Sequence, residues 1–118
     1  DGNRRREIKN ARIAIENAQL QQDDLRQALK ADLSNLWQAY QNNIEMLKLE
    51  RENLIAAVEN HEIASERYML GNLSGIEMRE AQKSLLDAEE RILSAEYDTK
   101  MCEISLLQLS GKITKYLE

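Results

Sequence analysis

The sequence contains no proline and no phenylalanine, only four glycines, and aromatic residues make up 4% of its 118 positions. Proline breaks the interior of a helix and glycine weakens it, so little in this chain would interrupt a long helix. A compact globular core takes much of its contact area from aromatic side chains, and their scarcity argues against such a core. The strong helix formers Ala, Leu, Glu, Gln, Lys and Arg dominate and favour long helices packed along thin seams.

An excess of basic charge is also lacking, since 16 Lys and Arg stand against 21 Asp and Glu, with both signs mixed along the chain. A nucleic-acid-binding protein would show a clustered basic face, so no nucleic-acid partner is expected. The one basic run, Arg4-Arg5-Arg6, is followed directly by Glu7 and is interpreted as a solvated helix start. No apolar run approaches the ~20 residues of a membrane-spanning helix.

Residues that carry chemistry are equally scarce, with one histidine, His61, and one cysteine, Cys102. No set of residues has the spacing of metal ligands or of a nucleophile with its base, and there is no glycine-rich phosphate loop. The chain is therefore expected not to be an enzyme and to bind no cofactor or metal. Cys102 is predicted to be a small buried packing residue, and Trp37 and Tyr40, one turn apart, are also assigned to packing.

What the chain does contain is a long stretch without a helix breaker, from Arg4 to Met69, after a capping turn at Asp1-Gly2-Asn3. A helix over about 3–70 would be ~100 Å long at 1.5 Å per residue, which is typical of coiled coils. Because the chain begins at Asp1 and not at a methionine, we expect it to be a piece of a longer protein.

A strong break follows this stretch. Gly71 can adopt the left-handed conformation that ends a helix. Ser74 and Glu77 then fit the S-x-x-E capping box, and Leu73 and Met78 occupy the positions of a hydrophobic staple. Stop and start signals fall within about five residues, so the two helices should be antiparallel neighbours.

These signals predict an all-α fold for residues 1–118: a long antiparallel two-helix coiled-coil hairpin. The first helix should cover about 3–70, the turn 71–74 and the second helix about 75–117, with Gly111 as a candidate for an earlier end. Because the second helix is shorter, roughly the first 20 to 25 residues of the first helix should overhang the hairpin.

The second helix carries two apolar stripes. The first has 4–3 spacing with large and small residues alternating over its first half, which allows a neighbouring helix to come close; it comprises Ala81, Leu85, Ala88, Ile92, Ala95, Thr99, Cys102, Leu106, Leu109, Ile113 and Tyr116. The second lies on another side and comprises Leu86, Leu93, Tyr97, Met101, Ile104 and Leu107. One partner cannot cover both stripes, which indicates a helix between two neighbours, as in a ring of helices, or a hairpin that dimerises into a four-helix bundle.

The first helix has a weaker apolar stripe, interrupted by polar stretches such as Gln41-Asn42-Asn43, which suit a wet face. The stripe comprises Ile8, Ala11, Ile15, Ala18, Leu25, Leu29, Leu36, Tyr40, Leu47, Leu54 and Val58. Since its first members lie on the overhang, the isolated chain is expected to self-associate, and sedimentation showing a stable monomer at high micromolar concentration would contradict this.

The residues around the turn, 66–82, read ERYMLGNLSGIEMREAQ and are followed by Leu85-Leu86-Asp87-Ala88 and by the stretch from Leu106 to Gly111. They resemble the TolC-type outer-membrane efflux proteins, whose repeats share an R-Y-x-x-G-x-x-S turn, an A-Q-x-x-L-L-x-A stretch and a final L-x-x-L-x-G. The opening residues 1–5 are also similar to the entry into the long helix of that family. The resemblance covers essentially the whole chain.

The resemblance implies a component of a trimeric efflux channel in the outer membrane of a Gram-negative bacterium. Each subunit of such a channel supplies two helical repeats to a ring of twelve helices across the periplasm. This chain would be the hairpin of one repeat, the second, and thus a fragment of an α-barrel. It would form a periplasmic segment of the tunnel.

The resemblance also implies that the turn docks a periplasmic adaptor protein and, through it, an inner-membrane pump. The docking tip would consist of Tyr68, Leu70, Gly71, Asn72, Leu73 and Ser74. Glu77 and Glu80 match acidic positions that narrow the channel mouth in the family, where rings of carboxylates would disfavour anions and bind cations. Glu77 is also explained as the partner in the capping box, and Leu73 stands where family members can carry a basic residue.

Two other interpretations of the pattern remain. A periplasmic adaptor also has a long helical hairpin, although its arms tend to be of similar length, whereas the arms here are unequal. A generic coiled-coil scaffold would need no special chemistry at its turn. The unequal arms and the Tyr68 to Gly71 motif favour the channel.

Overall fold

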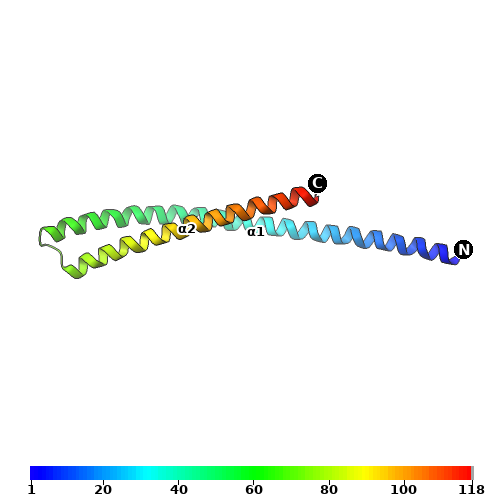
Figure 1. Ribbon diagram of the computed structural model, residues 1–118, viewed down its shortest axis with the longest axis horizontal. Helices are drawn as coiled ribbons and strands as arrows, with labels where there is room; N and C mark the ends of the chain where they lie inside the picture. The colour runs from blue at the N-terminus through cyan, green and yellow to red at the C-terminus, as the bar shows by residue number, and fades with distance from the viewer. Residues whose placement is uncertain (118) are drawn as a thin grey trace.

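The computed structural model describes residues 1–117, which form two helices, α1 (Gly2–Met69) and α2 (Gly75–Leu117), joined by a short turn (Figure 1). The helices run antiparallel, and the molecule measures 103 × 23 × 14 Å. The predicted all-α hairpin is confirmed. The prediction that Gly111 could end the second helix is wrong, because α2 continues past it to Leu117.

The start of α1 is capped by Asp1, whose carboxylate oxygen Oδ1 accepts a hydrogen bond from the backbone N–H of Asn3 at 3.4 Å. The helix therefore begins at Gly2, one residue before the predicted start. An aspartate suits this place because it accepts hydrogen bonds from N–H groups that have no partner in the first turn.

The end of α1 has the hydrogen bonds of a Schellman motif. The N–H of Asn72 donates to the carbonyl of Arg67 at 2.8 Å, and the N–H of Gly71 donates to the carbonyl of Tyr68 at 3.0 Å. Gly71 has φ +77°, the left-handed conformation predicted for it. The turn is thus a hydrogen-bonded reversal.

The start of α2 is a capping box, as predicted. The N–H of Glu77 donates to the hydroxyl of Ser74 at 3.1 Å, and the Glu77 carboxylate accepts from the N–H of Ser74 at 3.5 Å. Met78 is buried and Leu73 half-buried, as expected for the staple positions next to such a box. Both ends of the five-residue link are therefore fixed by local hydrogen bonds.

Replacing Gly71 by alanine should destabilise the hairpin by about 1–2 kcal/mol, because a side chain at positive φ crowds the following carbonyl. Nothing lies within 4 Å of the added Cβ, so the loss would come from the backbone alone. Gly111→Ala is the matched control, and it should stabilise by about 0.5–1 kcal/mol because Gly111 lies inside a helix. Urea unfolding followed by circular dichroism measures both, and equal effects of the two substitutions would contradict the assignment.

The seam between the helices is formed on α2 by the predicted 4–3 stripe from Ala81 to Ile113, whose members are buried or half-buried. Tyr116 is the exception and lies exposed, so its assignment to the seam is wrong. The most covered side chain is that of Ala88, with 0% exposure, and Ala95 is also buried. Small residues at these positions allow the two backbones to approach closely.

The seam on α1 differs from its predicted stripe. Val58 is exposed, and Ala57 and His61 beside it lie in the seam instead. Most covered positions follow a 4–3 spacing from Tyr40 onward; these and the two before them are Leu29, Leu36, Tyr40, Asn43, Leu47, Glu50, Leu54, Ala57, His61 and Ala64. Ala39, Ile44 and Ser65 are half-buried beside this row. Polar residues thus occupy seam positions that an apolar pattern cannot reveal.

One of these polar residues is Asn43, which was predicted to lie on a wet face. Its side-chain amide donates to the sulfur of Cys102 at 3.0 Å, and its backbone carbonyl accepts from the hydroxyl of Thr99 at 3.3 Å. Cys102 is half-buried, so it is less covered than predicted. The Asn43 prediction was wrong because α2 offers polar partners that hold this amide between the helices.

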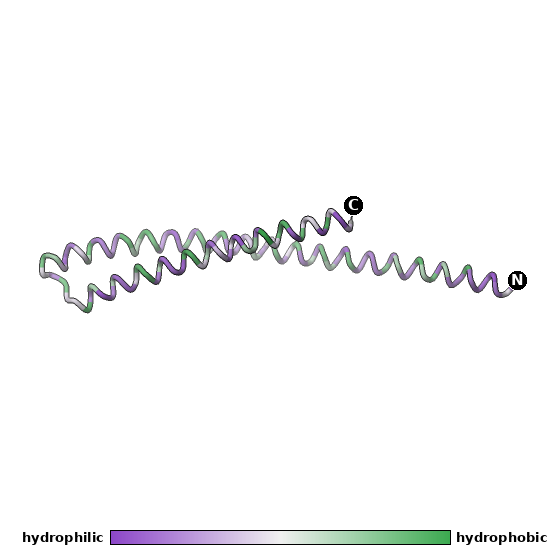
Figure 2. The backbone as a smooth tube through the Cα atoms, viewed as in Figure 1, coloured by the Kyte–Doolittle hydropathy of each residue, from purple (hydrophilic) through white to green (hydrophobic). Residues whose placement is uncertain are grey.

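Within the described residues, 1–117, the first part of α1 has no partner helix. Every residue from 1 to 28 is exposed, and coverage by α2 begins at Leu29. Figure 2 shows that apolar residues continue along this overhang, toward the N-terminus beyond the end of α2. The predicted overhang is therefore present, slightly longer than expected. Along residues 1–117 no stretch of helix is long and apolar enough to cross a membrane.

Candidate functional site

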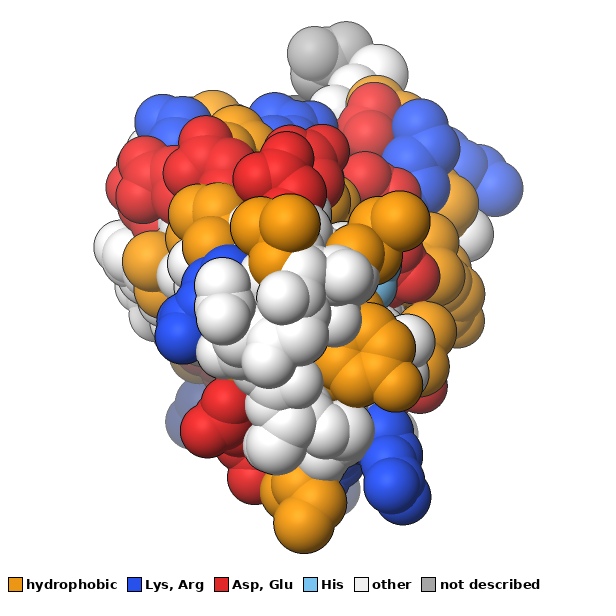
Figure 3. All heavy atoms as spheres, turned by 90° about the vertical axis from the view of Figure 1, so that its left-hand side faces the viewer, with side chains coloured by type: hydrophobic (Ala, Val, Ile, Leu, Met, Phe, Trp, Pro, Cys, Tyr) orange, Lys and Arg blue, Asp and Glu red, His pale blue; other side chains and the backbone are white. Residues whose placement is uncertain are grey.

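The tip of the hairpin brings together all six residues predicted for docking, at the end of the molecule shown in Figure 3. Leu70 is 75% exposed, Tyr68 is half exposed, and Gly71, Asn72 and Ser74 lie at the surface. Leu73 is the most covered of the six. Seen end-on, polar side chains and backbone lie at the centre of the tip, apolar side chains flank them, and acidic side chains gather along one edge (Figure 3).

Two apolar residues at the tip were missed by the sequence analysis. Met69 is 85% exposed and Ile76 is 68% exposed, more than most apolar residues along the rod. Their exposure could have been predicted from their position, since each stands within one residue of a helix end and outside both apolar stripes. With Leu70 they place exposed apolar side chains around the hydrogen-bonded turn.

The candidate gate residues, Glu77 and Glu80, follow the tip in the first turns of α2. Both are exposed, and they lie three residues apart on one side of the helix. The Glu77 carboxylate closes the capping box with Ser74. Glu77 therefore has a structural role at the start of α2.

The second apolar stripe of α2 is uncovered along its length. Leu86, Leu93, Tyr97 and Leu107 are each more than half exposed, and Met101 and Ile104 are partly exposed. The opposite helix also has large exposed apolar residues away from the seam, including Leu49, Ile55 and Ile63. Exposed apolar stripes of this length are typical of surfaces that other protein covers.

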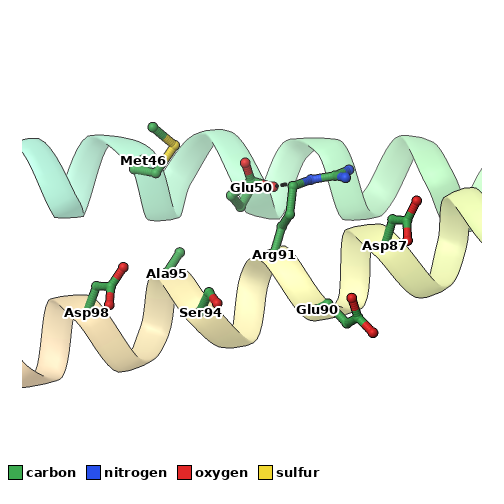
Figure 4. Close-up of a pocket in the computed structure, with 8 residues that line it drawn as sticks. All are labelled: Met46, Glu50, Asp87, Glu90, Arg91, Ser94, Ala95 and Asp98. Carbon is green, nitrogen blue, oxygen red and sulfur yellow. Dashed lines mark hydrogen bonds and ion pairs between the residues drawn. The ribbon is translucent and has the colours of Figure 1, made fainter.

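Halfway along the seam lies an ion pair that the sequence analysis did not predict. Arg91 of α2 reaches across to Glu50 of α1, and its Nε donates to the carboxylate at 3.1 Å (Figure 4). Glu50 is 8% exposed, whereas half of the Arg91 side chain is open to solvent. The pair borders an open groove that is also lined by Met46, Asp87, Glu90, Ser94, Ala95 and Asp98.

Among the described residues, no group of three or more His, Cys, Asp or Glu side chains is arranged to hold a metal ion. The surfaces of this rod are instead suited to contacts with protein. They are an apolar tip, uncovered stripes along both helices and an overhang of about 28 residues at the start of α1.

The fold and these surfaces define the class: a coiled-coil rod whose apolar sides offer places for further helices. The chain matches the model of the outer membrane efflux protein family over residues 1–112, and it belongs to that family. This confirms the resemblance seen at the turn and in the stretches after it. The match also indicates an efflux protein located at the outer membrane. No curated protein and no solved structure matches the chain.

Proposed function

We propose that this hairpin is a periplasmic segment of the helical tunnel in a trimeric outer-membrane efflux channel. Its turn would be both the periplasmic mouth and the docking tip for an adaptor protein, which links the channel to an inner-membrane pump. The hairpin would carry no catalytic site and need no cofactor. It would contribute part of the tunnel wall and a contact surface for the adaptor protein.

The observation that carries this proposal is the second, uncovered stripe of α2 together with the seam. A helix with apolar residues on two sides packs between two neighbours, which a ring of alternating helices provides for each member. The overhang of α1 fits the same picture, because apolar residues such as Ile8 and Ile15 need partners from outside this chain. The isolated hairpin would bury these apolar surfaces by self-association.

The geometry of the tip supports its role in docking. The Schellman motif and the capping box hold the link in one conformation, so little conformational entropy would be lost on binding. Leu70 and its neighbours Met69 and Ile76 offer apolar contacts to a partner. A rigid apolar tip suits contact with the tip of another helical hairpin.

Glu77 and Glu80 are proposed as carboxylates at the mouth. Trimer symmetry would repeat each of them around the axis, and rings of carboxylates favour cations over anions in a pore. Their exposed position just after the tip supports this role.

The alternative of an adaptor hairpin is disfavoured by two observations. The matched family is that of outer membrane efflux proteins, over residues 1–112. The arms are also unequal, 68 residues in α1 and 43 in α2, whereas adaptor hairpins tend to have similar arms.

Cross-linking in the full-length channel tests the docking tip. Asn72→Cys, in a Cys102→Ser background, would be coupled to a photoactivatable maleimide and illuminated with the adaptor present. Asn72 suits this because its backbone, not its side chain, makes the Schellman hydrogen bond. We expect an adduct with the adaptor from Asn72→Cys. Lys48→Cys, exposed midway along α1, is the control. Adducts from Lys48 without any from Asn72 would refute tip docking.

A further inference from the structure

We propose that one particular side of the hairpin lines the tunnel, an inference that rests on the proposed function. This side, the serine face, is formed on α2 by Ser84, Asp87, Arg91, Ser94, Asp98 and Ser105. The opposite side, the glutamate face, is formed on α2 by Glu89, Glu96 and Glu103. In the assembled channel the serine face would be the wall in contact with exported solutes, and the glutamate face would point away from the lumen.

The two faces are separated by the seam. Seam residues of α2 repeat every seven positions, as in Leu85, Ile92 and Thr99, so residues seven apart keep the same side of the seam. Ser84, Arg91, Asp98 and Ser105 form one such row. Asp87, Ser94, Met101 and Gln108 form a second row beside it, and Met101 is its only apolar member among these four. Glu89, Glu96 and Glu103 form a row on the other side.

The grooves between the helices confirm this division. On the serine face, Arg91 and Asp98 border a groove together with Glu50 of α1 (Figure 4). Further along the same side, Ser105 and Gln108 border a groove with Asp32 and Asn35 of α1. On the glutamate face, Glu103 and Ser110 border a groove with Leu33, Trp37 and Tyr40.

The serine face has the composition of a wall in contact with water. Hydroxyl, amide and carboxylate groups dominate it on α2, where Met101 is the large exposed apolar exception. On α1 the exposed apolar residues of the same side are Met46, Leu49 and Ile63. Its basic residue halfway along the rod, Arg91, is paired with Glu50 at 3.1 Å. On α2 this side therefore presents mainly polar groups to solvent.

The glutamate face has an apolar patch that a water-filled lumen would leave wet. Trp37 is 52% exposed, and Leu33 and Leu107 are exposed beside it. Leu107 also belongs to the second apolar stripe of α2, so the patch is continuous with the surface proposed to contact a neighbouring helix. Exposed apolar patches of this kind indicate contact with protein.

The proposed mouth residues agree with this assignment. Glu77 lies seven residues before Ser84, and Glu80 lies seven residues before Asp87. Both carboxylates are therefore on the serine face. A helix face that reaches the axis at the mouth would continue as the wall of the tunnel above it.

Labelling of the full-length channel tests the inference. Ser94→Cys and Glu96→Cys, each in a Cys102→Ser background, place an exposed thiol two residues apart but on opposite faces. Both would be coupled to the same bulky maleimide, with the extent of labelling measured by mass spectrometry, and the channel studied in a planar bilayer. We expect the label at Ser94→Cys to lower single-channel conductance by about twofold or more, and the label at Glu96→Cys to leave it unchanged.

The other outcomes separate the two proposals. A block from Glu96→Cys alone, or an equal block from both, would overturn the face assignment and leave the tunnel in place. If neither label changes the conductance of a channel that carries it, the hairpin does not line the pore, and the proposed function fails together with the inference.

Discussion

Arg91→Met should destabilise the hairpin by about 1–3 kcal/mol, because it leaves the buried Glu50 carboxylate without its hydrogen-bond donor. Half of the Arg91 side chain is exposed, so water can partly replace the guanidinium, which places the loss toward the lower end of this range. Methionine retains the unbranched stem and hence most of the packing. Urea unfolding at a fixed chain concentration measures the effect.

Glu50→Leu is the informative partner variant, because unlike Arg91→Met it should not lower the stability of the hairpin. It removes the buried charge and places an apolar side chain in the seam, while Arg91 can turn into water; the stability should stay equal or rise by about 1 kcal/mol. The double variant should then lack the loss seen for Arg91→Met alone. If Glu50→Leu destabilises more than Arg91→Met, the carboxylate stabilises the hairpin by contacts other than this pair.

The turn was predictable because its determinants are local. Gly71 takes the one conformation that favours glycine, and Ser74 and Glu77 satisfy each other's backbone N–H groups three residues apart. None of these interactions depends on the partner helix. The second stripe of α2 could likewise be read from spacing alone, since a helix with two apolar sides shows both in its sequence.

The seam of α1 was less predictable because three of its positions, Asn43, Glu50 and His61, are polar. Asn43 and Glu50 are accepted there through partners on α2, namely Thr99 with Cys102 and Arg91. Those partners are 41 to 59 residues away in sequence, so no local sequence pattern predicts these contacts. Because an apolar pattern does not include these polar members, the predicted stripe ended at Val58, one position beside the observed seam residue Ala57.

The candidate site shows the same contrast. The six tip residues follow from the turn motif and its resemblance to a family, and the structure places them at one end of the rod. The division into a serine face and a glutamate face required the register between the helices, which the Glu50–Arg91 and Asn43–Thr99 contacts supply. The α2 rows of each face follow from a stripe visible in the sequence, but which α1 residues lie on each side follows only from the placement of the two helices.

Ala88→Leu should cost about 1–3 kcal/mol, because its added atoms have no space between the helices. Ala88 is the most covered residue, with 0% exposure, and the register set by the contact of Thr99 with Asn43 places it level with Leu54 of α1. A leucine there would push the helices apart or adopt a strained rotamer. The same urea experiment measures the loss.

Ala56→Leu is the matched control, since the same change is made at an exposed alanine within the part of α1 that α2 covers. Leucine and alanine have similar helix propensities, so this variant should change stability by less than about 0.5 kcal/mol. A comparable loss in both variants would show that the cost lies in α-helix formation. No loss at Ala88 would mean that the helices can separate there at little cost, and the close approach through small residues would not hold the seam together.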